Sequence, residues 1–250
     1  MYNPFSLEGK TIFVTGASSG IGRGTAIECA KMGAKIVLSG RNEDRLQQTL
    51  SSLEGEGHVV LCGDLNLEDT RKEIVDNMPM LNGAVYSAGI SQIKMAKFMD
   101  QLSLESIFQT NVFSPLMLNT LLLKKKKIQK NSSVIFISSI SGMYRSQIGE
   151  GGYGATKAAL AGYVKSLALE LSAQGIRVNT IHPGVIETPL LEVSNGTFGK
   201  EELEALRQKY PLKRFGKPED IARCAVYLLS DASSWMTGSN ILIDGGFTLK

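Results

Sequence analysis

Tyr153 and Lys157 are the residues of this sequence whose types and spacing most directly indicate chemistry. They stand four positions apart in a segment of helical composition, so both side chains can meet one ligand on the same helix face. A phenol with an ordinary pKa of about 10 is a weak base near neutral pH, but an adjacent ammonium stabilises the phenolate and lowers that pKa. The pair predicts an acid/base phenol that Lys157 tunes.

A serine-rich segment, SSISG at positions 138–142, follows an apolar run upstream of this pair. Ser139 stands at the carboxyl end of the strand that this run predicts. Its hydroxyl can donate a hydrogen bond to a substrate oxygen on which negative charge develops during hydride addition. Ser138 and Ser141 are the competing choices for this role.

A second functional element is predicted near the N-terminus, in the glycine-rich turn TGASSGIG at positions 15–22. The turn follows an apolar run and precedes residues 23–32, which have helical composition. Glycines let the backbone approach a ligand closely, and the free N–H groups and dipole of a helix start attract an anion. The complete strand, turn and helix therefore predicts a cradle for a dinucleotide pyrophosphate, more specifically than the glycines alone.

The end of the second predicted strand indicates which dinucleotide is preferred. An acidic residue there selects NAD, whereas a basic residue accepts the 2′-phosphate of NADP. The sequence has Ser39-Gly40-Arg41 and no carboxylate at this point. Because a guanidinium grips a phosphate with its planar fork, NADP(H) is favoured and NAD(H) is possible. The alternative interpretation is that Arg41 is an exposed loop arginine.

Short apolar runs rich in Val and Ile alternate with longer segments of helical pattern, and they position these sites. The runs are nearly continuous in hydrophobicity, which strands need when helices cover both faces of a parallel sheet. We therefore expect an α/β, doubly wound, Rossmann-type fold of one domain spanning residues 1–250. A loop or lid is expected over the site at 192–200, within a wider segment 190–212. The predicted strands are Thr11–Val14, Lys35–Leu38, His58–Cys62, Gly83–Tyr86, Ser133–Ile137, Arg177–Ile181 and Asn240–Ile243.

The composition narrows the class of protein. With 43% hydrophobic and 20% charged residues, the 250-residue chain can bury a sizeable core. A formal net charge of +3 without a broad basic face argues against nucleic-acid binding, and the lysine run 124–127 is interpreted as a solvated helix end. Without a signal-like N-terminus or a membrane-length apolar stretch, we expect a cytoplasmic protein that does not bind membranes. Cys29, Cys62 and Cys224 are expected to be small buried hydrophobes, and no metal site is predicted.

The glycine turn, Ser87-Ala88-Gly89, Asn111, the Ser139 segment, Tyr153 with Lys157, and HPG at 182–184 through Thr188 together resemble the short-chain dehydrogenases/reductases. The resemblance extends from residue 9 to residue 246. It implies a seven-stranded parallel sheet, an enzyme acting on CH–OH groups, and a homotetramer.

The resemblance also implies roles for individual residues. Ser139 orients the carbonyl, Tyr153 donates the proton in reduction, Lys157 holds the nicotinamide ribose, and Asn111 anchors a water that relays protons. Asp64 resembles the residue that meets the adenine. The residues expected at the cofactor are Gly16, Ser18, Ser19, Gly20, Ile21, Gly22, Arg41, Asp64, Leu65, Ser87, Ala88, Gly89, Tyr153, Lys157, Pro183, Gly184, Ile186 and Thr188.

Two features depart from the family pattern. The family usually has Asn where this chain has Ser87, which puts the rigidity of that turn in doubt. The segment from Ser139 to Tyr153 is also about one residue longer than in many relatives, which affects the shape of the pocket beside the nicotinamide.

The substrate is indicated only by resemblance. The segment KRFGKPEDIA at 213–222 and the ending DGG at 244–246 are similar to the bacterial 3-oxoacyl-carrier-protein reductases of the family, which implies a 3-oxoacyl thioester or similar ketone and a place in fatty acid biosynthesis. Arg145, Lys130 and the lysine run 124–127 are candidates for docking an acidic carrier protein. The alternatives are a sugar, polyol or steroid alcohol dehydrogenase of the same fold and a non-enzymatic NADP-binding regulator.

Other notable residues are interpreted as structural. His182 precedes a Pro-Gly pair and is expected to bond the backbone rather than transfer protons. Tyr144, Tyr163 and Tyr210 have no lysine four positions later, so they are interpreted as packing or rim aromatics. Trp235 is expected in core or interface packing.

Overall fold

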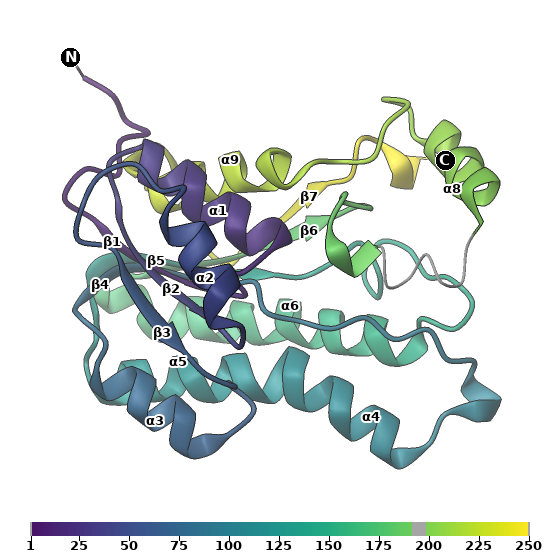
Figure 1. Ribbon diagram of the computed structural model, residues 1–250, viewed down its shortest axis with the longest axis horizontal. Helices are drawn as coiled ribbons and strands as arrows, with labels where there is room; N and C mark the ends of the chain where they lie inside the picture. The colour runs from purple at the N-terminus through teal and green to yellow at the C-terminus, as the bar shows by residue number, and fades with distance from the viewer. Residues whose placement is uncertain (1, 192–198, 250) are drawn as a thin grey trace.

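The computed structural model describes residues 2–191 and 199–249, and it contains a seven-stranded sheet with all strands parallel (Figure 1). The strand order is β3-β2-β1-β4-β5-β6-β7. The strands are β1 (Thr11–Thr15), β2 (Lys35–Gly40), β3 (Val59–Cys62), β4 (Leu81–Tyr86), β5 (Ile128–Ile137), β6 (Arg177–Pro183) and β7 (Asn240–Ile243).

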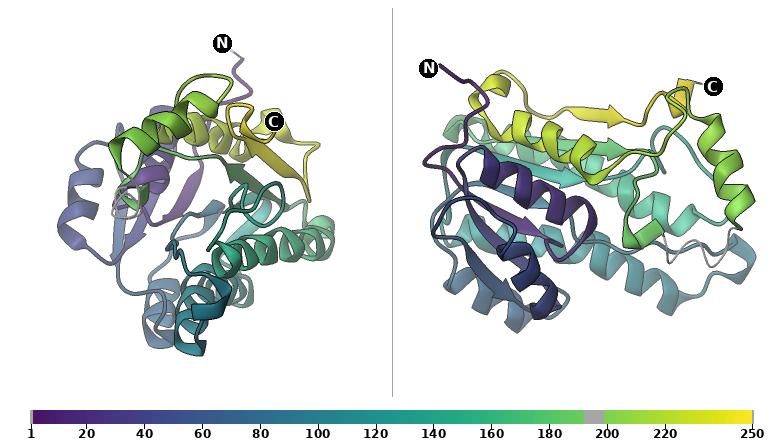
Figure 2. Two further views of the ribbon diagram at one scale, coloured as in Figure 1. Left: turned by 90° about the vertical axis from the view of Figure 1, so that its right-hand side faces the viewer. Right: turned by 45° about the horizontal axis from the view of Figure 1, so that its top comes forward.

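Helices cover both faces of the sheet, as the continuous apolar runs predicted (Figure 2). The α-helices are α1 (Gly20–Lys31), α2 (Glu43–Leu50), α3 (Glu68–Asp76), α4 (Gln101–Phe108), α5 (Ser114–Lys124), α6 (Gly151–Leu171), α8 (Lys200–Lys209) and α9 (Pro218–Leu229). The helices α1, α2 and α9 cover one face, and α3, α5 and α6 cover the other (Figure 1). The predicted doubly wound α/β fold is confirmed.

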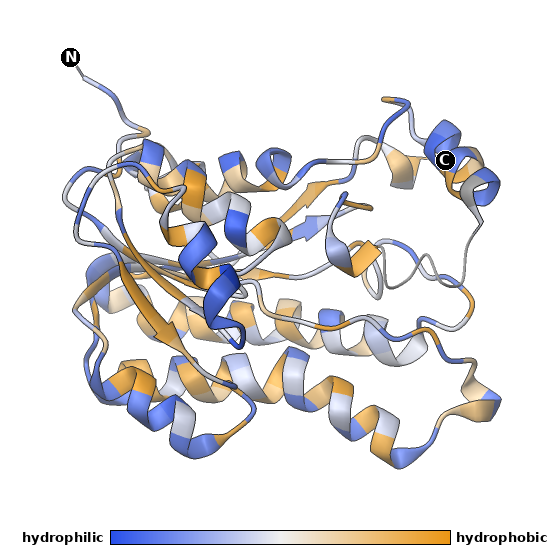
Figure 3. Cartoon of the chain, viewed as in Figure 1, coloured by the Kyte–Doolittle hydropathy of each residue, from blue (hydrophilic) through white to orange (hydrophobic). Residues whose placement is uncertain are grey.

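The core consists of two layers that share the strands. Successive strand residues point to opposite faces, so Val14 packs with α1 and α9 while Phe13 packs with α3 and α5. Hydrophobic residues accordingly concentrate on the strands and the inward helix faces (Figure 3). A third, smaller cluster consists of Ile140, Tyr210, Phe215 and Phe247. It lies beyond the carboxyl ends of β5 and β7, since Ile140 follows β5 and Phe247 follows β7.

The strand order reverses between β1 and β4, and this reversal determines where a ligand can bind. The chain moves outward from β1 to β3, then returns to pair β4 on the other side of β1. At the carboxyl ends of β1 and β4, the loops that follow the two strands therefore run in opposite directions and leave a crevice. Open α/β sheets bind their ligands in such a crevice.

The predicted strand positions are close to those observed, and the differences have local causes. Strand β7 matches its predicted range, whereas β5 begins at Ile128, five residues earlier than predicted, because Leu81 of β4 pairs with Ile128 across a register shift. The lysine run ends α5 as predicted, but Lys127 also donates from Nζ to the Met78 carbonyl oxygen at 2.5 Å.

One prediction about an individual residue is wrong, and one of the two alternatives given for another is excluded. Cys62 is exposed, since it ends β3 at the edge of the sheet, although Cys29 is buried. Trp235 is fully exposed, so it lies outside the core, and the alternative of interface packing stays a prediction. No helix in the described residues is both long enough and apolar enough to span a membrane.

The predicted lid lies only partly within the described residues. Residues 192–198 fall outside them, while α8 lies beyond the carboxyl ends of β6 and β7 (Figures 1 and 2). Leu203 and Leu206 of α8 pack against the cluster around Phe247. The helix therefore packs beside the residues that follow β5 and β7, and the predicted movement of a lid stays a prediction.

Candidate active site

The glycine turn after β1 has the close backbone approaches that a dinucleotide cradle needs. Gly16 and Gly20 have φ angles of +66° and +52°, and α1 begins at Gly20. A Cβ at Gly16 would lie 2.9 Å from the Ala88 main chain, and one at Gly22 would lie 2.4 Å from the Gly16 oxygen. Only glycine permits this packing, so the turn fits a pyrophosphate at the start of α1.

The turn borders a crevice of about 230 Å³ at the carboxyl edge of the sheet. Most of the residues predicted at the cofactor line this one crevice. These residues are Gly16, Ser18, Ser19, Gly20, Ile21, Gly22, Arg41, Asp64, Leu65, Ser87, Ala88, Gly89 and Thr188.

Arg41 lies at the far end of this crevice from the catalytic candidates. It follows β2 directly, is exposed, and lines the crevice together with Gly40 and Ser18. No carboxylate in the described ranges forms an ion pair with it. The guanidinium is therefore available to a phosphate at this point of the crevice.

The turn after β4, where Ser87 departs from the family pattern, is hydrogen-bonded to β1. The Thr15 hydroxyl accepts hydrogen bonds from the main-chain N–H groups of Ser87 and Ala88, at 3.0 and 3.2 Å. This places the turn against β1 without help from the Ser87 side chain. Thr15 therefore holds the main chain of this turn, and the effect of Ser87 on its rigidity stays a prediction.

A second cavity, of about 480 Å³, adjoins the crevice. Ile21, Thr188 and Leu190 line both spaces, so a ligand in one borders a ligand in the other. The cavity wall includes Ser139 and Tyr153. The remaining predicted cofactor residues Pro183, Gly184 and Ile186 also line this cavity rather than the crevice.

Ser139 and Tyr153 come from neighbouring elements, the end of β5 and the first turn of α6. The loop between them packs against α6 at Gly142, where φ is +92° and a Cβ would lie 2.1 Å from the Gly154 oxygen. The Ser141 main-chain N–H donates to the Ser139 hydroxyl at 3.1 Å. These contacts hold the serine and the phenol at one place on the cavity wall.

The pKa of Tyr153 differs in direction from the sequence-based prediction. Burial raises it to about 12, while a hydrogen bond with Ser139 lowers it and the Glu150 carboxylate raises it further. Lys157 does not offset this burial, because its Nζ donates to the Ile137 carbonyl at 3.0 Å and lies 5.7 Å from the phenol ring centre. A raised pKa keeps the Tyr153 hydroxyl protonated near neutral pH, and its role as a proton donor stays a prediction.

Lys157 is almost completely buried beneath the turn after β4. Burial lowers its pKa to about 8. A Cβ at Gly89 would lie 3.5 Å from the Lys157 Nζ and 3.2 Å from the Asn111 Oδ1, so the turn contacts both side chains. The structure thus brings Lys157 and Asn111 together, as the motif order implied.

Asn111 lies in a π-helical turn, Gln109–Phe113, that joins α4 to α5. Its Oδ1 accepts a hydrogen bond from the Ile90 N–H at 2.8 Å. Its Nδ2 donates to the Ile90 carbonyl at 2.9 Å and to the Thr156 hydroxyl at 3.1 Å. The side chain therefore ties the turn after β4 to α6. Its role in a water relay stays a prediction.

His182 bonds the backbone, as its place before Pro183 predicted. Its Nδ1 is 2.8 Å from the Ser139 carbonyl oxygen, and its Nε2 is 3.0 Å from the Thr180 hydroxyl. Burial lowers its pKa, which favours the neutral ring. The ring therefore positions the main chain of Ser139.

Four charged residues that line the cavity were not predicted for this site: Arg145, Glu150, Glu202 and Lys209. Glu150 lines the cavity and accepts a hydrogen bond from the Ser141 hydroxyl at 2.8 Å. Arg145, a candidate for a docking patch together with the lysine run, lines the cavity. The lysine run instead lies at the amino end of β5. No periodicity in the irregular loop 138–150 could have indicated these orientations.

Sequence and structure comparisons agree with this architecture. A family model described as Enoyl-(Acyl carrier protein) reductase matches residues 16–248. The chain is 33% identical over 243 residues to a 3-oxoacyl-(acyl-carrier-protein) reductase of Rickettsia felis, covering 97% of this chain and 98% of that protein. It is 34% identical over 254 residues to a tropinone reductase homolog of Arabidopsis thaliana, covering 98% and 95%.

A solved structure of a short-chain type dehydrogenase/reductase from Mycobacterium ulcerans superposes with a TM-score of 0.87, at 32% identity, covering 98% of this chain and 92% of that one. A parallel sheet with a dinucleotide-type crevice and an adjoining cavity defines an oxidoreductase of the Rossmann class. The chain belongs to the short-chain dehydrogenase/reductase family and is an enzyme acting on CH–OH groups.

Proposed function

We propose that this enzyme interconverts a ketone and a secondary alcohol with NADP(H), and that its substrate is a 3-oxoacyl thioester or a similar ketone. The observation that carries the proposal is that Ser139 and Tyr153 line the cavity that adjoins the crevice, while Lys157 is buried beside Gly89, which lines the crevice. The resemblance to a carrier-protein reductase supports the substrate class.

The residues of the crevice fit a dinucleotide, because the glycine turn leaves room at the start of α1 and Arg41 faces the same space. When bound, NADPH supplies a hydride to the carbonyl carbon. Arg41 favours the 2′-phosphate that distinguishes NADP from NAD. Lys157, beneath the turn after β4, holds the nicotinamide ribose.

The protein side chains complete the reduction by handling the carbonyl oxygen. Ser139 donates a hydrogen bond that orients the oxygen and stabilises its growing negative charge. Tyr153, with a pKa of about 12, keeps its proton at neutral pH and transfers it to that oxygen as the C=O bond becomes a C–OH bond. Oxidation of the alcohol reverses both transfers.

The test is turnover of an acetoacetyl thioester, followed by the absorbance of the reduced nicotinamide, with NADPH and NADH in parallel. Tyr153→Phe should lower kcat about a thousandfold, since only the ionisable hydroxyl is lost, while NADPH binding stays intact. Tyr163→Phe on the same helix, whose hydroxyl lies near Asn119, is the matched control and should keep its activity. Retained turnover in Tyr153→Phe would exclude the proton-donor role.

A further inference from the structure

We infer that Arg145 binds an oxyanion, such as a carboxylate, carried by the substrate close to the carbonyl that is reduced. The inference rests on the proposed function, because it concerns the substrate of the same site. It narrows the proposed substrate class, a 3-oxoacyl thioester or a similar ketone, to members that have an anionic group on the carbon chain of the ketone. The cavity that contains Arg145 also contains Ser139 and Tyr153.

The loop that carries Arg145 is fixed beside the catalytic serine. The Arg145 main-chain N–H donates to the Ile140 carbonyl at 3.0 Å, and its carbonyl accepts from the Gly142 N–H at 3.0 Å. Ile140 directly follows Ser139 and is buried. The backbone of Arg145 therefore stays near the residue that orients the carbonyl.

An aromatic stack fixes the side chain. The guanidinium carbon of Arg145 lies 4.0 Å from the centre of the Phe247 ring, and the Tyr210 ring is stacked on Phe247 at 4.3 Å with an interplanar angle of 8°. Because both lie this close to the Phe247 ring, the guanidinium of Arg145 and the ring of Tyr210 must occupy its opposite faces. The Tyr210 hydroxyl accepts a hydrogen bond from the Val185 N–H at 2.9 Å, which anchors the stack. Stacking leaves the guanidinium N–H donors at the edge of the group unused.

No acidic side chain in residues 2–191 and 199–249 neutralises this cation. The two carboxylates that line the same cavity have other partners: Glu150 accepts from the Ser141 hydroxyl, and Glu202 accepts from the Gly199 N–H at 2.9 Å. A half-buried guanidinium that is held in place without an anionic partner matches a carboxylate in charge and in its two-pronged geometry.

The position of Arg145 limits where the anion can be. The cavity of about 480 Å³ also holds the reacting carbonyl between Ser139 and Tyr153. The anion must therefore be a short chain length from the carbonyl, as in a keto acid or in an acyl chain that ends in a carboxylate. A phosphate at the distant end of a carrier arm does not meet this condition.

The test compares acetoacetate and levulinate with their methyl esters, which keep the ketone and remove the charge. With NADPH, wild-type enzyme should have a lower KM for at least one of the acids than for its ester. Arg145→Gln should raise the KM of that acid roughly 10- to 100-fold, the effect of losing a charged hydrogen bond, and leave the KM of the ester and its kcat unchanged. Arg145→Lys should restore part of the preference.

Arg207→Gln is the matched control, because this arginine also lies over an aromatic ring, Phe215, at 5.1 Å, but is paired with Glu204 and does not line the cavity. It should leave both kinetic constants unchanged. Equal KM values for acids and esters in wild type and in Arg145→Gln would overturn the inference while leaving the carbonyl reductase function in place.

If no ketone is reduced, the proposed function fails, and binding then tests Arg145 separately. Levulinate with NADP⁺ should raise the unfolding temperature of wild type and of Arg207→Gln but not of Arg145→Gln. An equal rise in all three proteins would overturn the inference by an independent route.

Discussion

At the scale of single residues, the site combines two groups whose pKa values burial moves in opposite directions. Tyr153 is shifted to about 12 and Lys157 to about 8, so the neutral form of each side chain is favoured. The charged form of Lys157, whose catalytic role is proposed, therefore destabilises the fold. Such a conflict between activity and stability is common at functional sites.

Lys157→Met tests this conflict. The folded pKa of Lys157 lies below its ordinary value of 10.5, so the penalty for the charged form is fully present below pH 8 and is relieved as the pH rises to 10.5. The shift corresponds to about 3 kcal/mol, and the lost hydrogen bond to Ile137 offsets roughly 1 kcal/mol of the gain. At neutral pH the variant should be about 2 kcal/mol more stable than wild type and inactive.

Urea unfolding at neutral pH and at a pH near 10.5 provides the measurement. The advantage of Lys157→Met should largely disappear at the higher pH, because the wild-type lysine is then neutral in the folded chain and about half neutral in the unfolded chain. A variant that is less stable than wild type at neutral pH would contradict the burial penalty.

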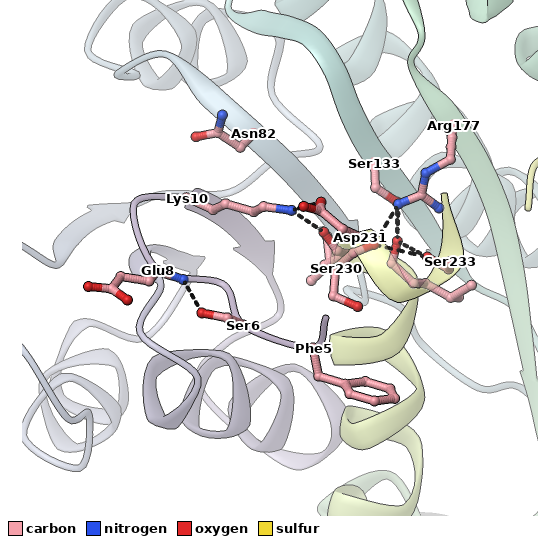
Figure 4. Close-up of polar contacts among 12 residues, drawn as sticks. Phe5, Ser6, Glu8, Lys10, Asn82, Ser133, Arg177, Ser230, Asp231 and Ser233 are labelled. Atoms are coloured by element: carbon pink, nitrogen blue, oxygen red, sulfur yellow. Dashed lines mark hydrogen bonds and ion pairs between the residues drawn. The ribbon is translucent and has the colours of Figure 1, made fainter. Parts of the chain in front are cut away.

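At the scale of elements, the carboxyl ends and the amino ends of the parallel strands have different roles. The carboxyl edge carries the site, whereas polar contacts at the amino edge join β6 to the end of α9 (Figure 4). Arg177, the first residue of β6, donates to the carbonyl oxygens of Leu228, Ser230 and Met236 at 2.7, 3.2 and 3.3 Å. Its charge complements the helix dipole at the carboxyl end of α9.

Arg177→Met should therefore destabilise the fold by about 2 kcal/mol, because buried carbonyl groups lose a charged donor. Denaturant unfolding measures the change, and the KM for NADPH should stay unchanged because the site is at the other edge. Arg223→Met is the matched control: this arginine is 69% exposed and lies 3.6 Å from Glu28, a surface pair that contributes less than about 1 kcal/mol. Equal effects of the two substitutions would show that Arg177 does not stabilise the end of α9.

At the scale of the whole molecule, cofactor binding and stability are linked. A ligand that binds only the folded chain raises its unfolding temperature according to its affinity. The crevice is formed by segments far apart in the sequence, from the turn after β1 to the loop after β6. Any dinucleotide bound there holds these segments together.

NADPH should raise the unfolding temperature more than NADH at equal concentration, because Arg41 favours the 2′-phosphate. Arg41→Asp should remove this difference and weaken NADPH binding about tenfold or more, at about 1.4 kcal/mol per decade. Arg45→Asp, a nearby exposed arginine outside the crevice, is the control and should keep the preference. Equal shifts with both cofactors in wild type would contradict the role of Arg41.

The assembly of the chain into a homotetramer stays a prediction. The small residues of α6 that could admit a neighbouring helix are on its open side: Ala155 is exposed, and a Cβ at Gly162 would meet nothing within 4 Å. Trp235, which is fully exposed near β7, offers a second apolar contact.

The sequence by itself determined the sheet, the glycine turn and the order of the motifs. These depend on local patterns, because continuous apolar runs require two-sided burial and a turn with positive φ requires glycine at Gly16. The spacing of Tyr153 and Lys157 placed them on one helix, and the basic residue at position 41 predicts a phosphate site, which stays a prediction. All of these are properties of short stretches of chain.

The tertiary structure decided what those groups meet. The pKa of Tyr153 is raised rather than lowered, because burial depends on elements that the local pattern around it does not include. Thr15 holds the main chain at Ser87 from another strand, and Arg145 faces the cavity because Phe247, at the far end of the chain, holds it there. Charge, burial and orientation depend on distant residues, which only the folded chain brings together.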